Sequence, residues 1–173
     1  MQWIAYFWSI TERHRMVTLF QFSRNIRKHG SKIENNSVEL TKRVAKKTLR
    51  SVVYGTPVDT GVARSNWRVS IGNPTFAVIP AYYPSEDLGR GEKLNAMATI
   101  SAGIKKIDKL RVGKKRGTGQ AGSALFISNA TPYLSQLRTG TSKQQPRDWV
   151  NLALIDASID IKQARLLVRG ENG

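Results

Sequence analysis

The chain has 173 residues, enough for one domain with a substantial core. It carries 28 Lys and Arg against 12 Asp and Glu, a net charge of +16, so we expect an anionic partner such as nucleic acid, an anionic membrane or an acidic protein surface. The lack of cysteine excludes disulfides, thiolate metal sites and cysteine nucleophiles, and two histidines, His14 and His29, are too few for a histidine-based zinc site. We therefore expect no cofactor and no metal.

The chain begins with an apolar, aromatic segment, residues 1–10. It is shorter than the roughly 20 residues that cross a bilayer, and it lacks the basic start and the cleavage site of a signal peptide. We expect no membrane contact and predict that residues 1–32 form an arm that packs on a partner or is flexible. A start at Met16 is an open alternative, and Gly30-Ser31 predicts a break before the first helix.

A long helix is predicted from about Ile33 to Tyr54. Its candidate caps are Asn35, Asn36 and Ser37, and its apolar stripe is Ile33, Leu40, Val44, Leu49 and Val52, filled by Ala45 and Thr48. The opposite face is cationic, with Lys42, Arg43, Lys46, Lys47 and Arg50. A solvated face is the commoner explanation, but the scarcity of acids four residues away favours a surface that binds DNA or an acidic partner.

The segment after this helix predicts a corner. Gly55 ends the helix, Pro57 prevents it from resuming, and Asp59 or Thr60 is expected to cap a turn over residues 61–65. Alternation from Trp67 to Ile71 predicts a strand, and a second strand over residues 76–79 would complete a hairpin.

A loop follows over residues 80–91. A second helix is predicted from about Glu92 to Leu110, with an apolar face of Leu94, Met97, Ile100, Ile104, Ile107 and Leu110. A basic run extends from its end into a glycine-rich loop and comprises Lys105, Lys106, Lys109, Arg111, Lys114, Lys115 and Arg116. The loop lacks the order of a P-loop, so a contact with polyanions and a solvated loop both stay open.

The last third predicts a strand over residues 124–129 and a short helix capped by Thr131, with Pro132 in its first position and Gly140 closing it. Pro146 opens a final helix that Gly170 ends, with Asp148 near its positive end and a core stripe of Trp149, Leu152, Ile155, Ile159 and Leu166. The predicted fold is α+β: a long N-terminal helix, a small antiparallel sheet, a central helix and a C-terminal helix, with long basic loops. One domain over residues 33–168 is expected, with a short tail over 169–173.

The triplet Asp59-Thr60-Gly61 raises the question of catalysis. In aspartic proteases this triplet supplies one of two carboxylates that share a proton in an apolar site. Here a basic helix stands where those enzymes have a hydrophobic strand, and no second apolar segment completes the site. No other nucleophile, base or paired carboxylates are grouped in the sequence, so we expect no enzyme and keep the protease as a remote alternative.

Two groups of residues carry a resemblance to a known family. Thr56-Pro57-Val58-Asp59-Thr60-Gly61, followed by Arg64 and Asn66-Trp67, and later Ile127-Ser128-Asn129, Pro132-Tyr133, Leu137, Gly140, Ser142-Lys143-Gln144 and Pro146, resemble the small tail-completion or neck proteins of tailed bacteriophages, the minor tail protein Z-like group. The ordered set spans about residues 33–165. It departs from the family at Arg138-Thr139, where an acidic residue is usual, and the aromatic arm has no counterpart.

The resemblance implies a structural virion protein of the head–tail junction, made in the host cytoplasm. It would form a ring, a hexamer or a dodecamer, that contacts the connector or adaptor and the tail terminator or tail tube and surrounds packaged DNA. The motif residues would then be structural: Pro57, Asp59, Thr60, Gly61, Arg64, Asn66, Trp67, Asn129, Pro132, Tyr133, Gly140 and Pro146. The alternative from charge alone is a basic nucleic-acid-binding protein of the packaging or ribosome-associated type.

Overall fold

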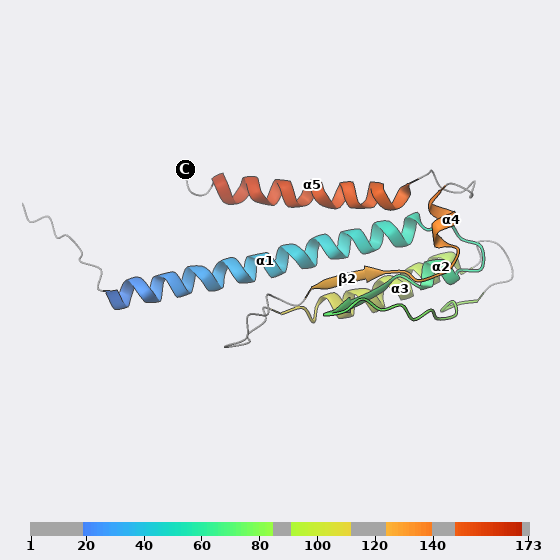
Figure 1. Cartoon of the computed structure of the whole chain (residues 1–173), viewed down its shortest axis with the longest axis horizontal. Coiled ribbons are helices and arrows are strands. Elements are labelled where there is room, and N and C mark those ends of the chain that lie inside the picture. Colours follow the sequence, from blue (N-terminus) through green and yellow to red (C-terminus); the bar gives the residue numbers. More distant parts are fainter. Residues whose placement is uncertain (1–18, 85–90, 112–123, 140–147, 171–173) are drawn as a thin grey trace, which may run out of the picture. The chain divides into compact units, whose positions relative to one another are not determined.

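The computed structural model of the chain describes residues 19–84, 91–111, 124–139 and 148–170 (Figure 1). It is a mixed α+β structure with a long N-terminal helix, a two-stranded antiparallel sheet, a central helix and a C-terminal helix, which confirms the predicted fold class. Contacts divide the chain into residues 1–33 and 34–173, which are described separately. The roles predicted for the arm, for one domain over 33–168 and for the tail over 169–173 stay predictions.

Helix α1 spans Leu19–Gly55, so the predicted break at Gly30-Ser31 is wrong. A glycine in an exposed helix costs only about 1 kcal/mol relative to alanine, and Gly30 is exposed, so the surrounding helix formers carry the helix through it. Because α1 begins at Leu19, the candidate caps Asn35, Asn36 and Ser37 lie inside the helix rather than at its start. In the N-terminal unit, Arg24 lies 4.9 Å from the ring centre of Phe20, one turn away.

The last turns of α1 form one wall of the core in the unit from residue 34 onward. Ala45, Leu49, Val52 and Val53 are buried, whereas Ile33, the first residue of the predicted stripe, is 69% exposed. The helix ends at Gly55 as predicted, and the glycine also leaves room for α5, because an added Cβ would lie 3.0 Å from the Trp149 ring, a tight contact.

The sheet joins β1, Arg68–Ile71, to β2, Leu125–Ser128, with Val69 opposite Ile127. The strand at 124–129 is therefore confirmed, and the predicted hairpin with residues 76–79 is wrong. A side chain takes the place of the partner strand there: Asn66 Oδ1 accepts from the Ile79 amide and Asn66 Nδ2 donates to the Ile79 carbonyl, both at 2.7 Å.

Helix α3, Glu92–Ile107, turns part of the predicted apolar face inward, and Leu110, just past its end, is buried too. Ile100 and Ile107 are buried, but Leu94 and Met97 are about half to two-thirds exposed, at 50% and 62%. The inward residues between them are small or polar: Asn95, Ala96, Thr99 and Gly103. An added Cβ at Gly103 would collide with Leu49 and Val69, so the small residues let α3 approach α1 and the sheet closely.

Helix α4 spans Leu134–Arg138, and α5 spans Trp149–Gly170. The N-cap residue of α4 is Tyr133, so the predicted capping by Thr131 is wrong; the chain first makes a turn in which the Leu134 amide bonds to the Thr131 carbonyl at 3.0 Å. Gly140 and Pro146 lie outside the described residues. Asp148 precedes α5 in a left-handed conformation, with φ of 59°, and its amide donates to the Arg138 carbonyl at 3.1 Å.

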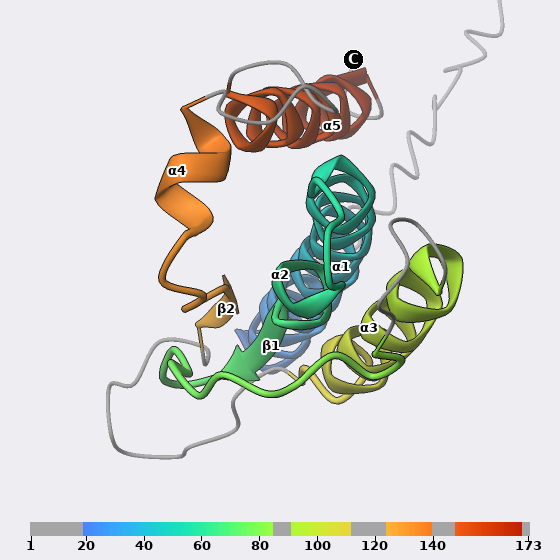
Figure 2. The ribbon, with the colours of Figure 1, turned by 90° about the vertical axis from the view of Figure 1, so that its right-hand side faces the viewer.

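Helix α5 buries a narrower strip than predicted. Trp149, Ala153 and Ala157 are buried, whereas the expected core residues Leu152, Ile155 and Ile159 are 55%, 57% and 45% exposed. The side chain of Leu166 lies outside the described residues. The C-terminal turns of α1 lie between α5 on one side and α3 with the sheet on the other (Figure 2). In the described parts of the chain, no helix has the length and apolarity needed to cross a bilayer.

Candidate functional site

The motif segment 56–67 folds into a tight corner between α1 and β1. Its helix α2, Val62–Ser65, has Gly61 as N-cap residue, with φ of 80° and no side-chain cap, and Asp59 and Thr60 are exposed. The predicted cap from Asp59 or Thr60 is therefore wrong. Two features favour glycine at position 61. Its backbone is left-handed, and an added Cβ would lie 2.5 Å from Asn95 Nδ2.

Arg64 ties the end of α1 to the start of α3. It is only 3% exposed, yet its guanidinium donates to Glu92 Oε1 at 2.7 Å and to the Thr56 carbonyl at 2.7 Å. A third, longer bond of 3.4 Å reaches the Tyr54 carbonyl. A buried charge needs several partners, and the terminal nitrogens of this guanidinium reach three acceptors in two segments, whereas Arg64 Nε has no partner among the described residues.

Two buried asparagines hold the extended segment that follows β1. Asn66 pairs with both polar groups of Ile79 and also donates to the Val62 carbonyl at 2.7 Å. Asn95 does the same at Tyr83, accepting from its amide and donating to its carbonyl, each at 2.9 Å. Ser65, the neighbour of Asn66 in the chain, donates to Asn95 Oδ1 at 3.0 Å and accepts from the Tyr82 amide at 3.3 Å. Backbone that would otherwise need a neighbouring strand is thus paired by side chains.

Trp67 and Thr56 close the corner on the core side. Trp67 Nε1 donates to Thr56 Oγ1 at 2.7 Å, and Thr56 Oγ1 donates to the Val52 carbonyl at 2.6 Å. The Trp67 ring meets Trp149 of α5 edge-on, with centroids 6.1 Å apart. An aromatic pair of this geometry adds about 0.5–1.5 kcal/mol beyond its burial.

The later motif segment meets this corner through Asn129. Its Nδ2 donates to the Ala63 carbonyl at 2.8 Å, and its Oδ1 accepts from the Thr131 amide at 3.0 Å. Pro57 is buried in the corner, whereas Pro132 and Tyr133 are exposed at the start of α4. Arg64, Asn66, Trp67 and Asn129 thus all bond to backbone or side-chain groups of the same corner, residues 56–66.

Sequence reasoning missed Asn95, which anchors the α3 side of that corner. Asn95, Thr99 and Gly103 recur every four residues along α3, and all are buried. A stripe of small and polar residues at helical spacing was the available signal. It was overlooked because the larger apolar residues on the neighbouring face had the same period.

The cationic face of α1 is partly neutralised. Lys46 pairs with Asp108, just past α3, at 2.6 Å, and Lys47 pairs with Asp156 of α5 at 3.1 Å. Lys42 pairs with Glu39 at 2.8 Å on α1 itself. This hydrogen bond and the Lys42 charge lower the pKa of Glu39. The acids that the sequence lacked at helical spacing come mostly from other elements, so these lysines help to dock helices.

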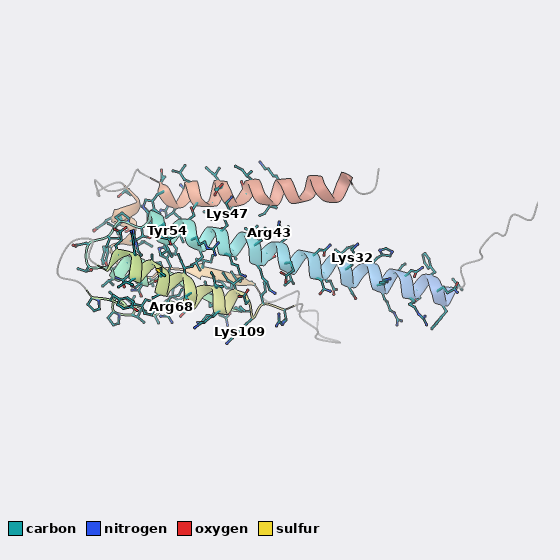
Figure 3. The ribbon with its side chains drawn as sticks, turned by 180° about the vertical axis from the view of Figure 1, so that it is seen from behind. Lys32, Arg43, Lys47, Tyr54, Arg68 and Lys109 are labelled. Carbon is teal, nitrogen blue, oxygen red and sulfur yellow. The ribbon has the colours of Figure 1, made fainter. Side chains whose placement is uncertain are left out.

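Other cations of the two predicted runs have no acid partner among the described residues. They are Arg43, Arg50, Lys105, Lys106 and Lys109, and Arg111 makes only a long bond of 3.4 Å to the Asp108 carbonyl. Figure 3 shows Arg43 on α1 and Lys109 near the end of α3. Lys114, Lys115 and Arg116 lie outside the described residues.

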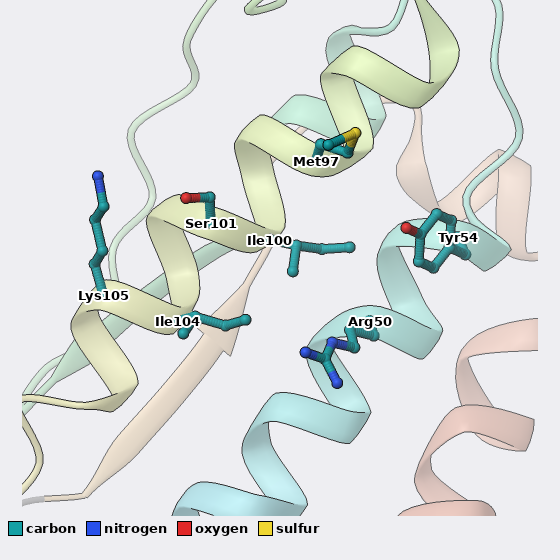
Figure 4. A pocket seen from close by; sticks show the side chains of 7 residues that line it. All are labelled: Arg50, Tyr54, Met97, Ile100, Ser101, Ile104 and Lys105. Carbon is teal, nitrogen blue, oxygen red and sulfur yellow. The ribbon is translucent and has the colours of Figure 1, made fainter.

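An open cleft lies between α1 and α3. Its volume is about 410 Å³, and its lining is Arg50, Tyr54, Met97, Ile100, Ser101, Ile104 and Lys105. Ile100 and Ile104 point from α3 toward Arg50 and Tyr54 on α1 (Figure 4). The cleft therefore has an apolar floor and cations at its edge.

Comparisons with protein families, with curated proteins and with solved structures find no match to this chain. Within the described residues, no group of three or more His, Cys, Asp or Glu side chains is arranged to hold a metal ion.

Proposed function

We propose that this protein is a structural part of a bacteriophage neck or tail, a ring subunit that joins the tail to the head connector and surrounds the DNA channel. The observation that carries the proposal is the convergence of the resembling residues. Arg64, Asn66 and Trp67 lie in the corner itself, and Asn129 comes from the later motif segment. All four side chains hold the same corner by hydrogen bonds: Arg64 and Trp67 to Thr56, Asn66 to the Val62 carbonyl and Asn129 to the Ala63 carbonyl. An ordered motif whose members have a joint structural task supports kinship with assembly proteins more than a catalytic role.

The exposure of Asp59 bears on the protease alternative. Shared-proton catalysis by carboxylates needs a site that limits water, and Asp59 is exposed at the outer edge of the corner. The proposal therefore assigns Asp59 no chemistry. It makes the protein a building block whose partners are its own copies and neighbouring neck and tail subunits.

The test is assembly of the full-length protein after nuclease treatment, followed by mass photometry and negative-stain electron microscopy. We expect a closed ring with a single dominant subunit number. A monomer at every concentration, with no ring after mixing with connector and tail-tube subunits, would contradict the proposal. Trp67→Ala is a suitable reference variant, because it breaks the corner that supports the fold.

A second function, binding of nucleic acid, is favoured by five cations that meet no acid among the described residues, Arg43, Arg50, Lys105, Lys106 and Lys109. Each phosphate contact steepens the fall of affinity with salt, with a log–log slope of about −0.9 per contact on duplex DNA. Duplex affinity should be measured at several salt concentrations for the native chain and for Lys106→Gln/Lys109→Gln, with the exposed Lys93→Gln as a control. A steep slope that only the double variant reduces would favour this function; a flat, weak response would exclude it.

A further inference from the structure

The N-terminal part of α1, residues 19–33, carries its apolar and its charged side chains on opposite faces. The apolar side chains, here called the α1 stripe, are Leu19, Phe22, Ile26 and Ile33, which are 55–87% exposed. On a helical wheel these four positions fall within an arc of about 60°. Apolar residues spaced by three, four and seven along a helix are the anchors of helices that dock in grooves, so the α1 stripe has the pattern of a docking face.

The opposite face of the same segment is cationic. It carries Arg24, Arg27, Lys28 and Lys32, and residues 19–33 contain no Asp or Glu. None of these four side chains meets an acid among the described residues; Figure 3 shows Lys32 on this part of α1. Arg24, Lys28 and Lys32 are spaced four residues apart, and like charges at this spacing destabilise a helix. An acidic partner would therefore stabilise the segment as well as bind it.

The acids of this chain are poorly placed to supply that partner. Four of the described acids are already paired with Lys or Arg of the same chain, namely Glu39, Glu92, Asp108 and Asp156. The remaining described acids lie apart from one another, at Glu34, Asp59 and Asp148. Two copies of residues 19–33 placed side by side would bring eight cations together, which repel. The charge thus favours a protein of different sequence.

The width of the α1 stripe favours a protein groove over a bilayer. Ser23 and His29 border the stripe on its two sides, so the apolar seam is narrow. A seam of this kind is typical of a helix that packs against other helices. A helix that lies in a membrane interface instead buries the whole face opposite its cations.

We propose that residues 19–33 dock as a helix in an apolar groove with acidic rims on a partner protein. The groove buries the α1 stripe, and the rims pair with Arg27 and Lys32, which flank the stripe at similar angles on its two sides. The long stems of these side chains let their charged ends reach acids beside the groove. This contact needs no ring, so it goes beyond the proposed neck function.

Calcium-loaded calmodulin is the probe for the test. It presents an apolar groove with acidic surroundings that accepts amphipathic helices of varied sequence, and removal of calcium closes that groove. Labelled calmodulin is titrated with the full-length, nuclease-treated chain, and binding is followed by fluorescence anisotropy. We expect binding in calcium and a loss of about ten-fold or more in affinity when calcium is chelated, because the α1 stripe then has no groove.

A matched pair of variants tests the α1 stripe. Ile26→Ser removes a stripe residue, and Phe20→Ser makes the same kind of change at a residue of the segment that is 70% exposed and lies outside the stripe. We expect Ile26→Ser to weaken calmodulin binding by about ten-fold or more and Phe20→Ser to leave it unchanged, because fully burying an Ile side chain is worth at least a factor of ten.

A second pair tests the acidic rims. Arg27→Gln/Lys32→Gln should weaken binding and flatten its dependence on salt, because two charged contacts are lost. Lys93→Gln/Lys106→Gln removes the same charge from exposed positions of α3 and should have neither effect. Equal effects of the two double variants would show that only net charge matters, and this result would overturn the inference.

The other outcomes are equally decisive. No binding to calcium-loaded calmodulin, or equal losses for Ile26→Ser and Phe20→Ser, would overturn the inference. Retention of the native chain but not of Ile26→Ser on phosphatidylglycerol–phosphatidylcholine vesicles would assign the α1 stripe to lipid, and weaker self-association of Ile26→Ser would assign it to a second copy. Either result would overturn it too. Ring formation by the native chain is measured separately, so failure of the proposed function is distinguishable from failure of this contact.

Discussion

The corner at residues 56–67 and helix α5 depart from the usual distribution of residues in opposite ways. In the corner, polar side chains are buried: Thr56, Ser65 and Asn66 are each 0% exposed, and Arg64 is 3% exposed. On α5, large apolar side chains are exposed while alanines are buried. Nearly all the polar groups of the corner find partners, Arg64 Nε being the exception, whereas the exposed apolar side chains of α5 are not covered by any described residue.

This difference separates what stabilises the subunit from what a partner would use. A buried polar network is costly unless it is fully paired, so it fixes one arrangement of the segments that it joins. An exposed apolar ridge adds little to the isolated subunit, and its burial becomes favourable only when a second surface covers it. Mutations in the two regions should therefore differ in both size and readout.

The largest effect is expected in the corner at Trp67. Trp67→Ala removes the edge-on contact with Trp149 and the hydrogen bond to Thr56, and it leaves a cavity at a site that is 7% exposed. We expect a loss of about 3–5 kcal/mol in the free energy of unfolding, measured by urea denaturation. Trp67→Phe keeps a ring and should lose less; equal losses would show that the ring contact is unimportant.

The next effect is expected at Asn66. Asn66→Ala leaves the Ile79 amide and the Ile79 and Val62 carbonyls without their partner. Each buried group left unpaired costs about 1–3 kcal/mol, reduced where water can enter. Hydrogen exchange at the Ile79 amide should accelerate beyond the change in global stability. The matched control is Asn73→Ala at an exposed turn, and protection of Ile79 that is equal in the two variants would refute the proposed role of the asparagine.

The sequence predicted the elements of this fold better than their partners. The strand ending at Ile71, the strand over residues 124–129, the helix end at Gly55 and the helix end at Gly170 depend on local signals, and the structure has them. The pairing of β1 with β2 was missed because it joins segments far apart in the chain. The bonds from Asn66 to Ile79 are also non-local, so no local pattern distinguishes that segment from a strand.

The sequence selected several residues of the corner but missed Asn95 and gave others the wrong local task. Gly61, Arg64, Asn66 and Trp67 were selected through the resemblance, but Asp59 and Thr60 were given a capping task that the structure denies. Burial of Arg64 could not be foreseen, because a charged side chain enters the interior only when several carbonyl groups converge on it. The exposure of Leu152, Ile155 and Ile159 on α5 could not be foreseen either. Apolar residues at helical spacing have the same sequence pattern whether or not another part of the protein covers them.

The smallest effect is expected on α5. Removing a large apolar side chain there should cost less stability than adding one. Ile159→Ser removes an apolar side chain that is 45% exposed, so the free energy of unfolding of the dilute subunit should change by no more than about 0.5 kcal/mol. Ala157→Leu adds apolar atoms at a site that is 6% exposed, and overpacking there should cost about 1–3 kcal/mol. Both are measured by urea denaturation at a concentration below that of self-association. If Ile159→Ser were the more destabilising substitution, the exposed apolar face of α5 would belong to the subunit's own core. The difference drawn between the corner and α5 would then be wrong.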